Sequence, residues 1–285
     1  MKHQSDILAL KYRPTDFKDL IGQEYLVETI QKSIEFNKIP NAYIFTGIRG
    51  VGKTTTARIV AKMLNCTAFD QNNKPDLSRC DQAKAISEDR HPDVIEIDAA
   101  SNTSVENARE IIENVKYNPV LGKYKVYIID EVHMLSKSAF NALLKTLEEP
   151  PPHSKFIFAT TEISKVPITI LSRCQRFDLR RIGKKTLFSF LEDIAKKEKI
   201  SISKEALNLI VRASDGSVRD SLSILDQSNI FKSQDEIQVE EIINMLGFAR
   251  QSDLYNLSKK ILENNLPEII KMLNDMYQRG SETSK

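Results

Sequence analysis

The sequence predicts an α/β domain with a doubly wound parallel sheet, followed by a region of helices alone. Short apolar runs rich in β-branched and aromatic residues alternate with helix-length periodic segments as far as residue 178, as in strands joined by crossover helices. One run leads into a glycine-rich loop, and another ends in two adjacent carboxylates. Beyond residue 178 only helical patterns recur, which predicts a separate helical region.

The composition is that of a globular protein with a sizeable core. Of 285 residues, 41% are hydrophobic and 28% charged, and 41 basic residues against 39 acidic ones give a net charge of +2. This balance gives no whole-surface argument for nucleic acid, so a DNA contact requires a local patch. The N-terminus lacks an apolar signal segment, no run approaches the ~20 residues of a membrane span, and three cysteines are few. We expect a cytoplasmic protein without a membrane partner.

The first strand is expected where the sequence reads AYIFT, residues 42–46, and it runs into the loop GIRGVGKT. This loop fits G-x-x-x-x-G-K-[ST], in which glycines let backbone N–H groups surround a phosphate at the positive end of the next helix. Lys53 would reach the β- and γ-phosphates, and the Thr54 hydroxyl would bind Mg²⁺. A chance match is the alternative, but the flanking strand and helix patterns favour a nucleotide. The residues expected to contact it are Gly47, Ile48, Arg49, Gly50, Val51, Gly52, Lys53, Thr54 and Thr55.

A second strand, KVYIID at residues 125–130, ends in the carboxylates of Asp130 and Glu131. Asp130 would orient the Mg²⁺ shell, and Glu131 would polarise a water against the γ-phosphate. A strand that merely ends in exposed acids is the alternative, and the phosphate loop upstream favours the catalytic interpretation. We interpret His133 as a residue engaged in packing or local hydrogen bonding.

Three further strand-like runs complete a five-stranded sheet. They read DVIEIDA, KFIFATT and QRFDL, and a helical stripe between the second strand and KFIFATT is stopped by Pro150–Pro152. Strands alternating with helices form a parallel sheet, which binds ligands at the carboxyl ends of its strands. Gly47 and Asp130 both follow such ends.

Six stretches resemble the N-terminal part of the bacterial DNA polymerase III gamma/tau family, clamp-loader ATPases of the AAA+ superfamily. They are KYRPTDFKDLIGQE, GIRGVGKTTTAR, EIDAASNTSVENAREI, YIIDEVHMLSKSAFNALLKTLEEPP, FATTEISKVPITILSRCQRF and GSVRDSLSILDQ. The resemblance implies an AAA+ nucleotide-binding domain at 1–178, a three-helix lid at 179–242 and the start of a helical collar at 243–285. It also implies a motor subunit that hydrolyses ATP to load the sliding clamp onto primed DNA.

The resemblance assigns further site residues. Arg13 and Pro14 would cover the adenine, and Thr161 would sense the γ-phosphate. Arg173 would act in trans as an arginine finger on the neighbouring subunit's ATP, and Arg219 would touch the γ-phosphate from the lid. The implied cofactors are ATP and Mg²⁺. The implied partners are the delta and delta-prime subunits, further gamma/tau copies, the sliding clamp and primer-template DNA.

Two departures from the family pattern affect these expectations. The family usually carries a four-cysteine zinc module, but only Cys66 and Cys80 remain here, since Leu77 and Ala83 stand near the other positions. Two thiolates do not close a tetrahedral zinc site, so we expect a looser, metal-free excursion at 66–90. The chain also stops early in the collar, which puts ring assembly in doubt.

Four alternatives stand beside a clamp-loader ATPase. Another AAA+ DNA motor, such as a Holliday-junction helicase, would carry a winged helix after the lid. A scaffold without ATPase activity would lack Lys53 and Glu131, and a small-molecule kinase would not need Arg173 and Arg219. A shortened form would bind ATP without forming a ring. The family is classed as a subunit of DNA-directed DNA polymerase, yet the sequence shows no carboxylate cluster for polymerase chemistry.

Overall fold

The computed structural model describes residues 7–71, 75–101, 105–231, 236–247 and 251–278. The chain divides into two compact units. One comprises Ala9–Gly183 with Ser217–Arg219, and the other comprises Met1–Leu8, Lys184–Gly216 and Asp220–Lys285. The first is a sheet unit and the second a helical unit, and each is described by itself.

The sheet unit is built on five parallel strands in the order β2-β3-β4-β1-β5. Their bounds are β1 (Ala42–Thr46), β2 (Val94–Asp98), β3 (Lys125–Asp130), β4 (Ser154–Thr160) and β5 (Gln175–Asp178). The predicted five-stranded parallel sheet is confirmed. Asp98 is in register with Asp130, and Thr46 with Thr160, so the ends of four strands form one edge.

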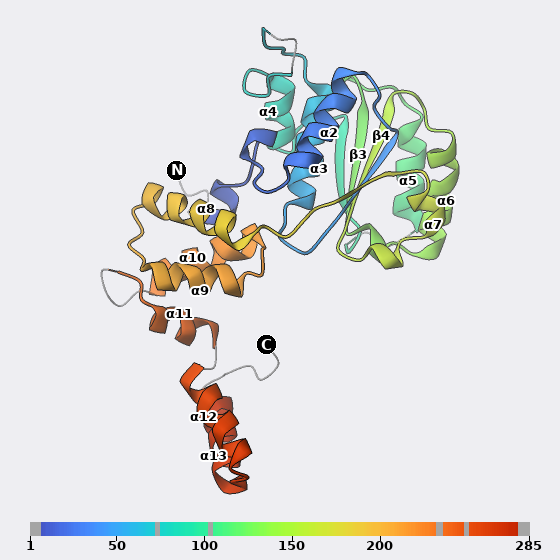
Figure 1. The fold of residues 1–285 in the computed structure, drawn as a ribbon. Coiled ribbons are helices and arrows are strands. Elements are labelled where there is room, and N and C mark those ends of the chain that lie inside the picture. Colours follow the sequence, from blue (N-terminus) through green and yellow to red (C-terminus); the bar gives the residue numbers. More distant parts are fainter. Residues whose placement is uncertain (1–6, 72–74, 102–104, 232–235, 248–250, 279–285) are drawn as a thin grey trace. The chain divides into compact units, whose positions relative to one another are not determined.

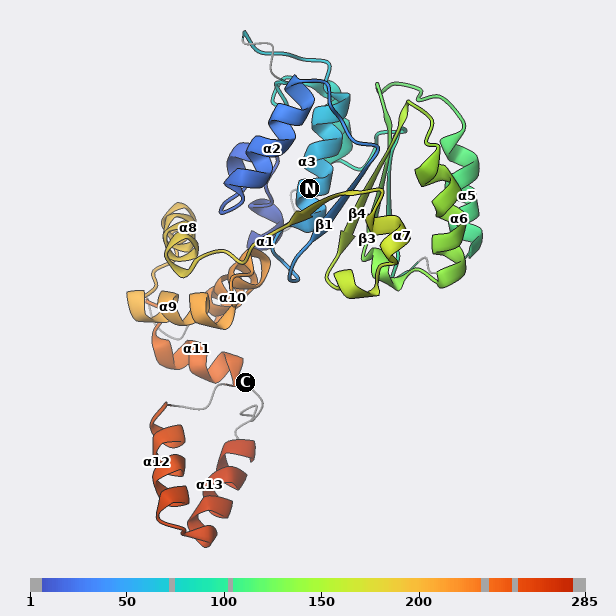
Figure 2. The same ribbon diagram turned by 45° about the vertical axis from the view of Figure 1, so that its right-hand side comes forward.

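Helices cover both faces of this sheet (Figures 1 and 2). Helices α2 and α3 lie on one face, and α5 and α6 lie on the other. The helices are α1 (Leu8–Lys11), α2 (Glu24–Glu35), α3 (Lys53–Asn65), α4 (Asp81–Ser87), α5 (Val105–Val115), α6 (Lys137–Glu148) and α7 (Ile168–Leu171). Short 3₁₀ turns stand at Phe17–Asp19, Val132–Met134 and Ile163–Lys165.

Alternation along the central strands divides the apolar side chains between two cores. Tyr43 and Phe45 of β1 belong to the core that includes Ile59 and Val60 of α3. Ile44, between them, belongs to the core on the opposite face, with Leu143 of α6. Successive strand side chains point to opposite faces, and a strand buried on both faces is therefore apolar throughout. This is why AYIFT and YIID show no polar alternation.

The helical unit contains α8 (Lys184–Lys197), α9 (Lys204–Ala213), most of α10 (Val218–Phe231), α11 (Val239–Leu246), α12 (Gln251–Leu262) and α13 (Leu266–Gln278). Helix α9 packs against α8 and α11, and α12 packs against α13. The domain boundary expected after residue 242 falls inside α11, where Ile242 is fully buried. Among the described residues, no helix combines the length and hydropathy needed to cross a membrane.

Candidate active site

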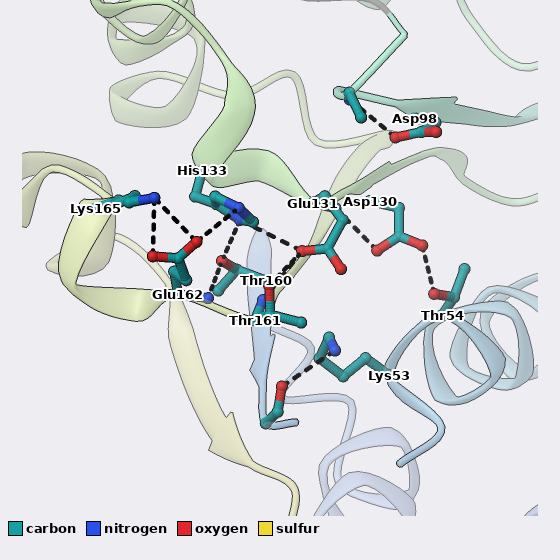
Figure 3. A network of polar contacts seen from close by, with 12 residues as sticks. Lys53, Thr54, Asp98, Asp130, Glu131, His133, Thr160, Thr161, Glu162 and Lys165 are labelled. Atoms are coloured by element: carbon teal, nitrogen blue, oxygen red, sulfur yellow. Dashed lines mark hydrogen bonds and ion pairs between the residues drawn. The ribbon is translucent and has the colours of Figure 1, made fainter. Parts of the chain in front are cut away.

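The polar residues predicted from the sequence gather at the carboxyl edge of the sheet (Figure 3). The start of α3 contributes Lys53 and Thr54, the end of β3 contributes Asp130 and Glu131, and Thr161 follows β4. Parallel strands bring these segments to one edge although they lie far apart in the chain.

The loop between β1 and α3 needs glycine at two positions. A Cβ on Gly47 would lie 2.7 Å from the backbone oxygen of Leu179. Gly52, which caps the N-terminus of α3, has a φ of 106°, in the left-handed region that favours glycine. The loop leads directly into the 13-residue helix α3. The first N–H groups of this helix and its dipole favour binding of an anion at its N-terminus.

Lys53 is buried beneath the loop. Its side chain Nζ donates hydrogen bonds to the carbonyl oxygens of Gly47 and Ile48, each at 3.1 Å. Burial lowers the pKa of the Lys53 ammonium, although the carboxylates of Glu131 and Asp130 act in the opposite direction. The cation is thus held on the loop beside both acids.

Thr54 and Asp130 form a short hydrogen bond between the start of α3 and the end of β3. Thr54 Oγ1 donates to Asp130 Oδ2 at 2.5 Å, and Asp130 Oδ1 accepts the Glu131 N–H at 2.9 Å. A hydroxyl and a carboxylate are oxygen donors of the kind that Mg²⁺ takes, and Mg²⁺ commonly uses one or two protein ligands together with substrate phosphates. No cluster of three or more His, Cys, Asp or Glu among the described residues could hold a metal ion. The donor set therefore fits Mg²⁺ delivered with a nucleotide.

Glu131 is held by the end of β4. Its Oε2 accepts hydrogen bonds from Thr161 N at 3.1 Å and Thr161 Oγ1 at 2.9 Å. His133 Nδ1 lies 3.3 Å from the same oxygen and 3.0 Å from Thr160 Oγ1. The local hydrogen bonding predicted for His133 is present, but the sequence did not identify Thr160 or Glu131 as its neighbours.

Arg13 reaches the start of α3 from the N-terminal segment. Its Nε donates to Thr55 Oγ1 at 3.3 Å. Burial lowers the pKa of the Arg13 guanidinium, and the charge of Arg58 acts in the same direction. Pro14 follows directly and is half-buried. The segment expected to cover the adenine therefore lies beside the phosphate loop.

Comparison with known proteins decides the family. The family model of the DNA polymerase III delta subunit matches residues 22–183, and that of the DNA polymerase III clamp loader subunit ATPase lid domain matches residues 187–233. DNA polymerase III subunit gamma of Buchnera aphidicola subsp. Schizaphis graminum is 44% identical, over 97% of this chain and 75% of that protein. The chain belongs to the DNA polymerase III gamma/tau family.

Other gamma/tau relatives are longer. DNA polymerase III subunit tau of Bacillus subtilis is 43% identical over 96% of this chain, and that of Escherichia coli is 42% identical over 97%. The chain spans only 48% and 42% of their lengths, respectively.

Solved structures give the fold class alone. The Thermotoga maritima RuvB Holliday junction branch migration motor has a TM-score of 0.62 and 18% identity, over 88% of this chain and 79% of that one. The predicted AAA+ fold is confirmed. The part of the chain described after residue 235 forms helices and no strand beyond a single bridge at Ile237, and so shows no winged helix there.

In this gamma/tau chain Arg173 forms hydrogen bonds with residues of α6 and α7. Its Nη2 donates to Glu148 Oε1 at 2.5 Å, and its Nη1 donates to the Thr169 carbonyl oxygen at 2.6 Å. The side chain is 32% exposed. Arg219, the other arginine that the resemblance assigns, belongs to the sheet unit together with Ser217 and Val218. Its backbone N–H donates to the Gly50 carbonyl oxygen at 3.3 Å.

Within the excursion at 66–90, the described residues include α4 and a small buried cluster. Cys66 and Cys80 are free and buried, and pack with Ala83 against Leu77. Burial raises the pKa of Cys66 to about 11. Burial is the largest influence on the pKa of Cys80 and raises it, but hydrogen bonds with Ala83, Thr67, Cys66 and Ala68 together outweigh burial, and the net shift is downward. Cys174 is free, with its pKa raised to about 12 by burial.

Proposed function

We propose that this chain is the ATP-hydrolysing motor of a bacterial replicative clamp loader, which places the sliding clamp on primed DNA in the cytoplasm. The observation that carries the proposal is the contact of Thr54 Oγ1 with Asp130 Oδ2 at 2.5 Å. It joins the phosphate loop to the strand end that carries Glu131. Membership of the gamma/tau family supports the same conclusion.

The loop residues 47–55 bind the phosphates of ATP. Backbone N–H groups at the start of α3 surround the β-phosphate, and Lys53 leaves the loop carbonyls to pair with the β- and γ-phosphates. Arg13 and Pro14 lie against the base. Thr54 and Asp130 would hold Mg²⁺, which would neutralise negative charge on the phosphates.

Glu131 is the general base. Its carboxylate accepts a proton from the attacking water, whose oxygen bonds to the γ-phosphorus as the bond to the ADP oxygen breaks. Thr161 orients Glu131 through its N–H and hydroxyl and senses the γ-phosphate. Arg219 contacts the γ-phosphate of its own ATP.

Arg173 supplies the finger for a neighbouring site. It lies after α7, bound to Glu148 rather than to the residues of its own phosphate loop, which supports action in trans. The finger requires a ring with the delta and delta-prime subunits and further gamma/tau copies. That ring would open the sliding clamp and release it on primer-template DNA.

Mg²⁺-dependent hydrolysis of ATP tests the proposal. We expect the parent chain to bind ATP and hydrolyse it, with turnover stimulated when delta, delta-prime, the clamp and primed DNA are added. Lys53→Ala should abolish binding because it removes the cation facing the phosphates, whereas Lys84→Ala, at an exposed position of α4, should not. Equal ATP affinity in Lys53→Ala and the parent would contradict the assignment.

Measuring the mass of the complexes formed when the chain is mixed with delta and delta-prime distinguishes a subunit that assembles from a shortened form that does not. A chain that binds ATP but stays at its monomer mass in that mixture would be a form that does not assemble.

A further inference from the structure

His133 occupies a buried position directly behind the proposed base. It lies in the 3₁₀ turn Val132–Met134 that follows Glu131, and only 6% of its side chain is exposed. Figure 3 shows the imidazole between the carboxylates of Glu131 and Glu162. A polar ring in such a place must satisfy both nitrogens within the protein.

The Nδ1 side of the ring faces Glu131. Nδ1 lies 3.3 Å from Glu131 Oε2 and 3.0 Å from Thr160 Oγ1. An ionised carboxylate can only accept, so a proton on Nδ1 would be attracted to Glu131 Oε2 as well as to its hydrogen-bond partner Thr160 Oγ1. Thr160 Oγ1 itself accepts the N–H of Glu162 at 3.0 Å, which fixes the hydroxyl oxygen beside the ring.

The Nε2 side is held from the opposite direction. Nε2 lies 3.5 Å from Glu162 Oε1, and Lys165 Nζ lies 2.8 Å from Glu162 Oε2. The hydrogen bond from Lys165 lowers the pKa of Glu162, and the His133 charge acts in the same direction. Glu162 is thus a carboxylate that Lys165 anchors beside Nε2.

Glu131 needs such external support. Its backbone is in the left-handed region, with φ 46° and ψ 45°, a conformation that non-glycine residues keep only where the surroundings enforce it. Its carboxylate oxygen Oε2 accepts a hydrogen bond from the Thr161 hydroxyl, and His133 Nδ1 lies 3.3 Å from the same oxygen. Without the ring, one of the groups that direct this oxygen would be lost.

We propose that His133 is a positioning residue that donates Nδ1–H to Glu131 and holds the carboxylate in the orientation in which it takes the proton of water. The inference rests on the proposed function, because it assigns a role within the same hydrolysis. His133 does not touch the nucleotide, and so it acts on turnover through Glu131 and not on ATP affinity.

Three substitutions of His133 distinguish the roles of its two ring nitrogens. The amide NH₂ of His133→Asn falls near the Nδ1 position, that of His133→Gln falls near the Nε2 position, and His133→Phe keeps the ring volume without a donor. We expect kcat to fall about tenfold or more in His133→Phe and His133→Gln, since a small displacement of a catalytic group has such effects. KM and the Kd for ATP should stay near the parent values, and His133→Asn should recover most of the parent kcat.

Equal kcat in His133→Asn and His133→Gln, whether near the parent or reduced, would overturn the inference. So would a rise in the Kd for ATP that accounts for the lost activity. Thermal unfolding of each variant shows whether the fold is retained.

A readout without turnover separates this inference from the proposed function. The imidazole nitrogens of the chain's four histidines can be followed by ¹H–¹⁵N NMR, with His133→Asn giving the assignment. A His133 Nδ1–H signal that shifts in Glu131→Gln supports the hydrogen bond, and an unprotonated Nδ1 overturns it. A parent chain that binds ATP but hydrolyses none contradicts the proposed function, and the NMR result then decides the contact by itself.

Discussion

Thr54 Oγ1 and Asp130 Oδ2 lie 2.5 Å apart although 76 positions separate them in the chain. One begins the helix after β1 and the other ends β3. Their two oxygens are the metal ligands proposed here, so substitution of the hydroxyl tests the pairing directly.

Thr54→Val keeps the shape of the side chain but removes its hydroxyl. We expect the Mg²⁺ concentration for half-maximal ATP hydrolysis to rise about tenfold or more, because even outer-sphere changes weaken metal affinity by that factor. Thr54→Ser retains an oxygen and serves as the matched control. A Mg²⁺ titration of steady-state hydrolysis gives the result, and identical curves for Val and Ser variants would remove Thr54 from the metal site.

Glu131→Gln tests the base. An amide cannot accept the proton of water, whereas Asp130 and Thr54 remain to hold Mg²⁺. Hydrolysis should fall by about 10²-fold or more while ATP binding persists. Glu149→Gln, at an exposed position after α6, should match the parent. Unchanged turnover of Glu131→Gln in the assembled complex would exclude Glu131 as the base.

Asp93 supports the loop before β3 rather than the chemistry. It is 1% exposed, and its carboxylate accepts the N–H groups of Val120, Leu121 and Gly122, each at 2.7 Å. Asp93→Ala should lower the free energy of unfolding by about 3 kcal/mol or more, since each of three hydrogen bonds to a charged group contributes ~1.5–3 kcal/mol. Urea denaturation measures this, with exposed Asp193→Ala as control.

The same carboxylate predicts a pH dependence. Burial raises the pKa of Asp93, but the three N–H donors outweigh it, so the folded pKa lies below the ordinary 3.8. Its stabilisation is therefore complete above pH 3.8 and is lost as the pH falls through the lower folded value. The difference in unfolding free energy between parent and Asp93→Ala should be constant at neutral pH and shrink below pH 3.8. A difference that grows on acidification would contradict the sign.

The cysteines predict the metal content. We expect no stoichiometric zinc in the purified protein. Thiol titration in denaturant should count three free cysteines, in agreement with the free state of Cys66, Cys80 and Cys174. Cys66 and Cys174 should react slowly in the native protein, because burial raises their pKa values to about 11 and about 12 and little thiolate forms. One tightly held zinc per chain would show that other side chains complete a site.

The sequence allowed the strands and the phosphate loop to be predicted for physical reasons. A strand buried on both faces must be apolar throughout, and a phosphate loop must place glycine, lysine and threonine at fixed spacing. Contacts between side chains from different segments leave no such pattern. The resemblance assigns Thr161 to the γ-phosphate but gives no indication that its hydroxyl donates to Glu131, 30 positions away. His133 and Glu148 are ordinary residues in a helical or turn sequence, and their partners follow only from tertiary structure.

Arg173→Ala tests the ring mechanism. The guanidinium is bound by Glu148 and Thr169 of its own chain, on the segment after α7. Arginine fingers contribute about 10³-fold or more to hydrolysis in related NTPases. In the complex with delta, delta-prime, clamp and primed DNA, Arg173→Ala should therefore bind ATP nearly normally and lose stimulated hydrolysis. Arg176→Ala, which removes a half-exposed arginine paired with Asp178, should retain it.

Mixing two inactive chains makes the test specific to action in trans. Arg173→Ala keeps a sound phosphate loop, whereas Lys53→Ala keeps a sound finger, so a ring that contains both should recover part of the stimulated activity. Recovery cannot arise if Arg173 serves the ATP of its own chain, because neither chain then holds a complete site. Mass measurement must first establish that the mixture assembles. Normal hydrolysis by Arg173→Ala within an assembled ring would leave Arg173 with a structural role beside Glu148.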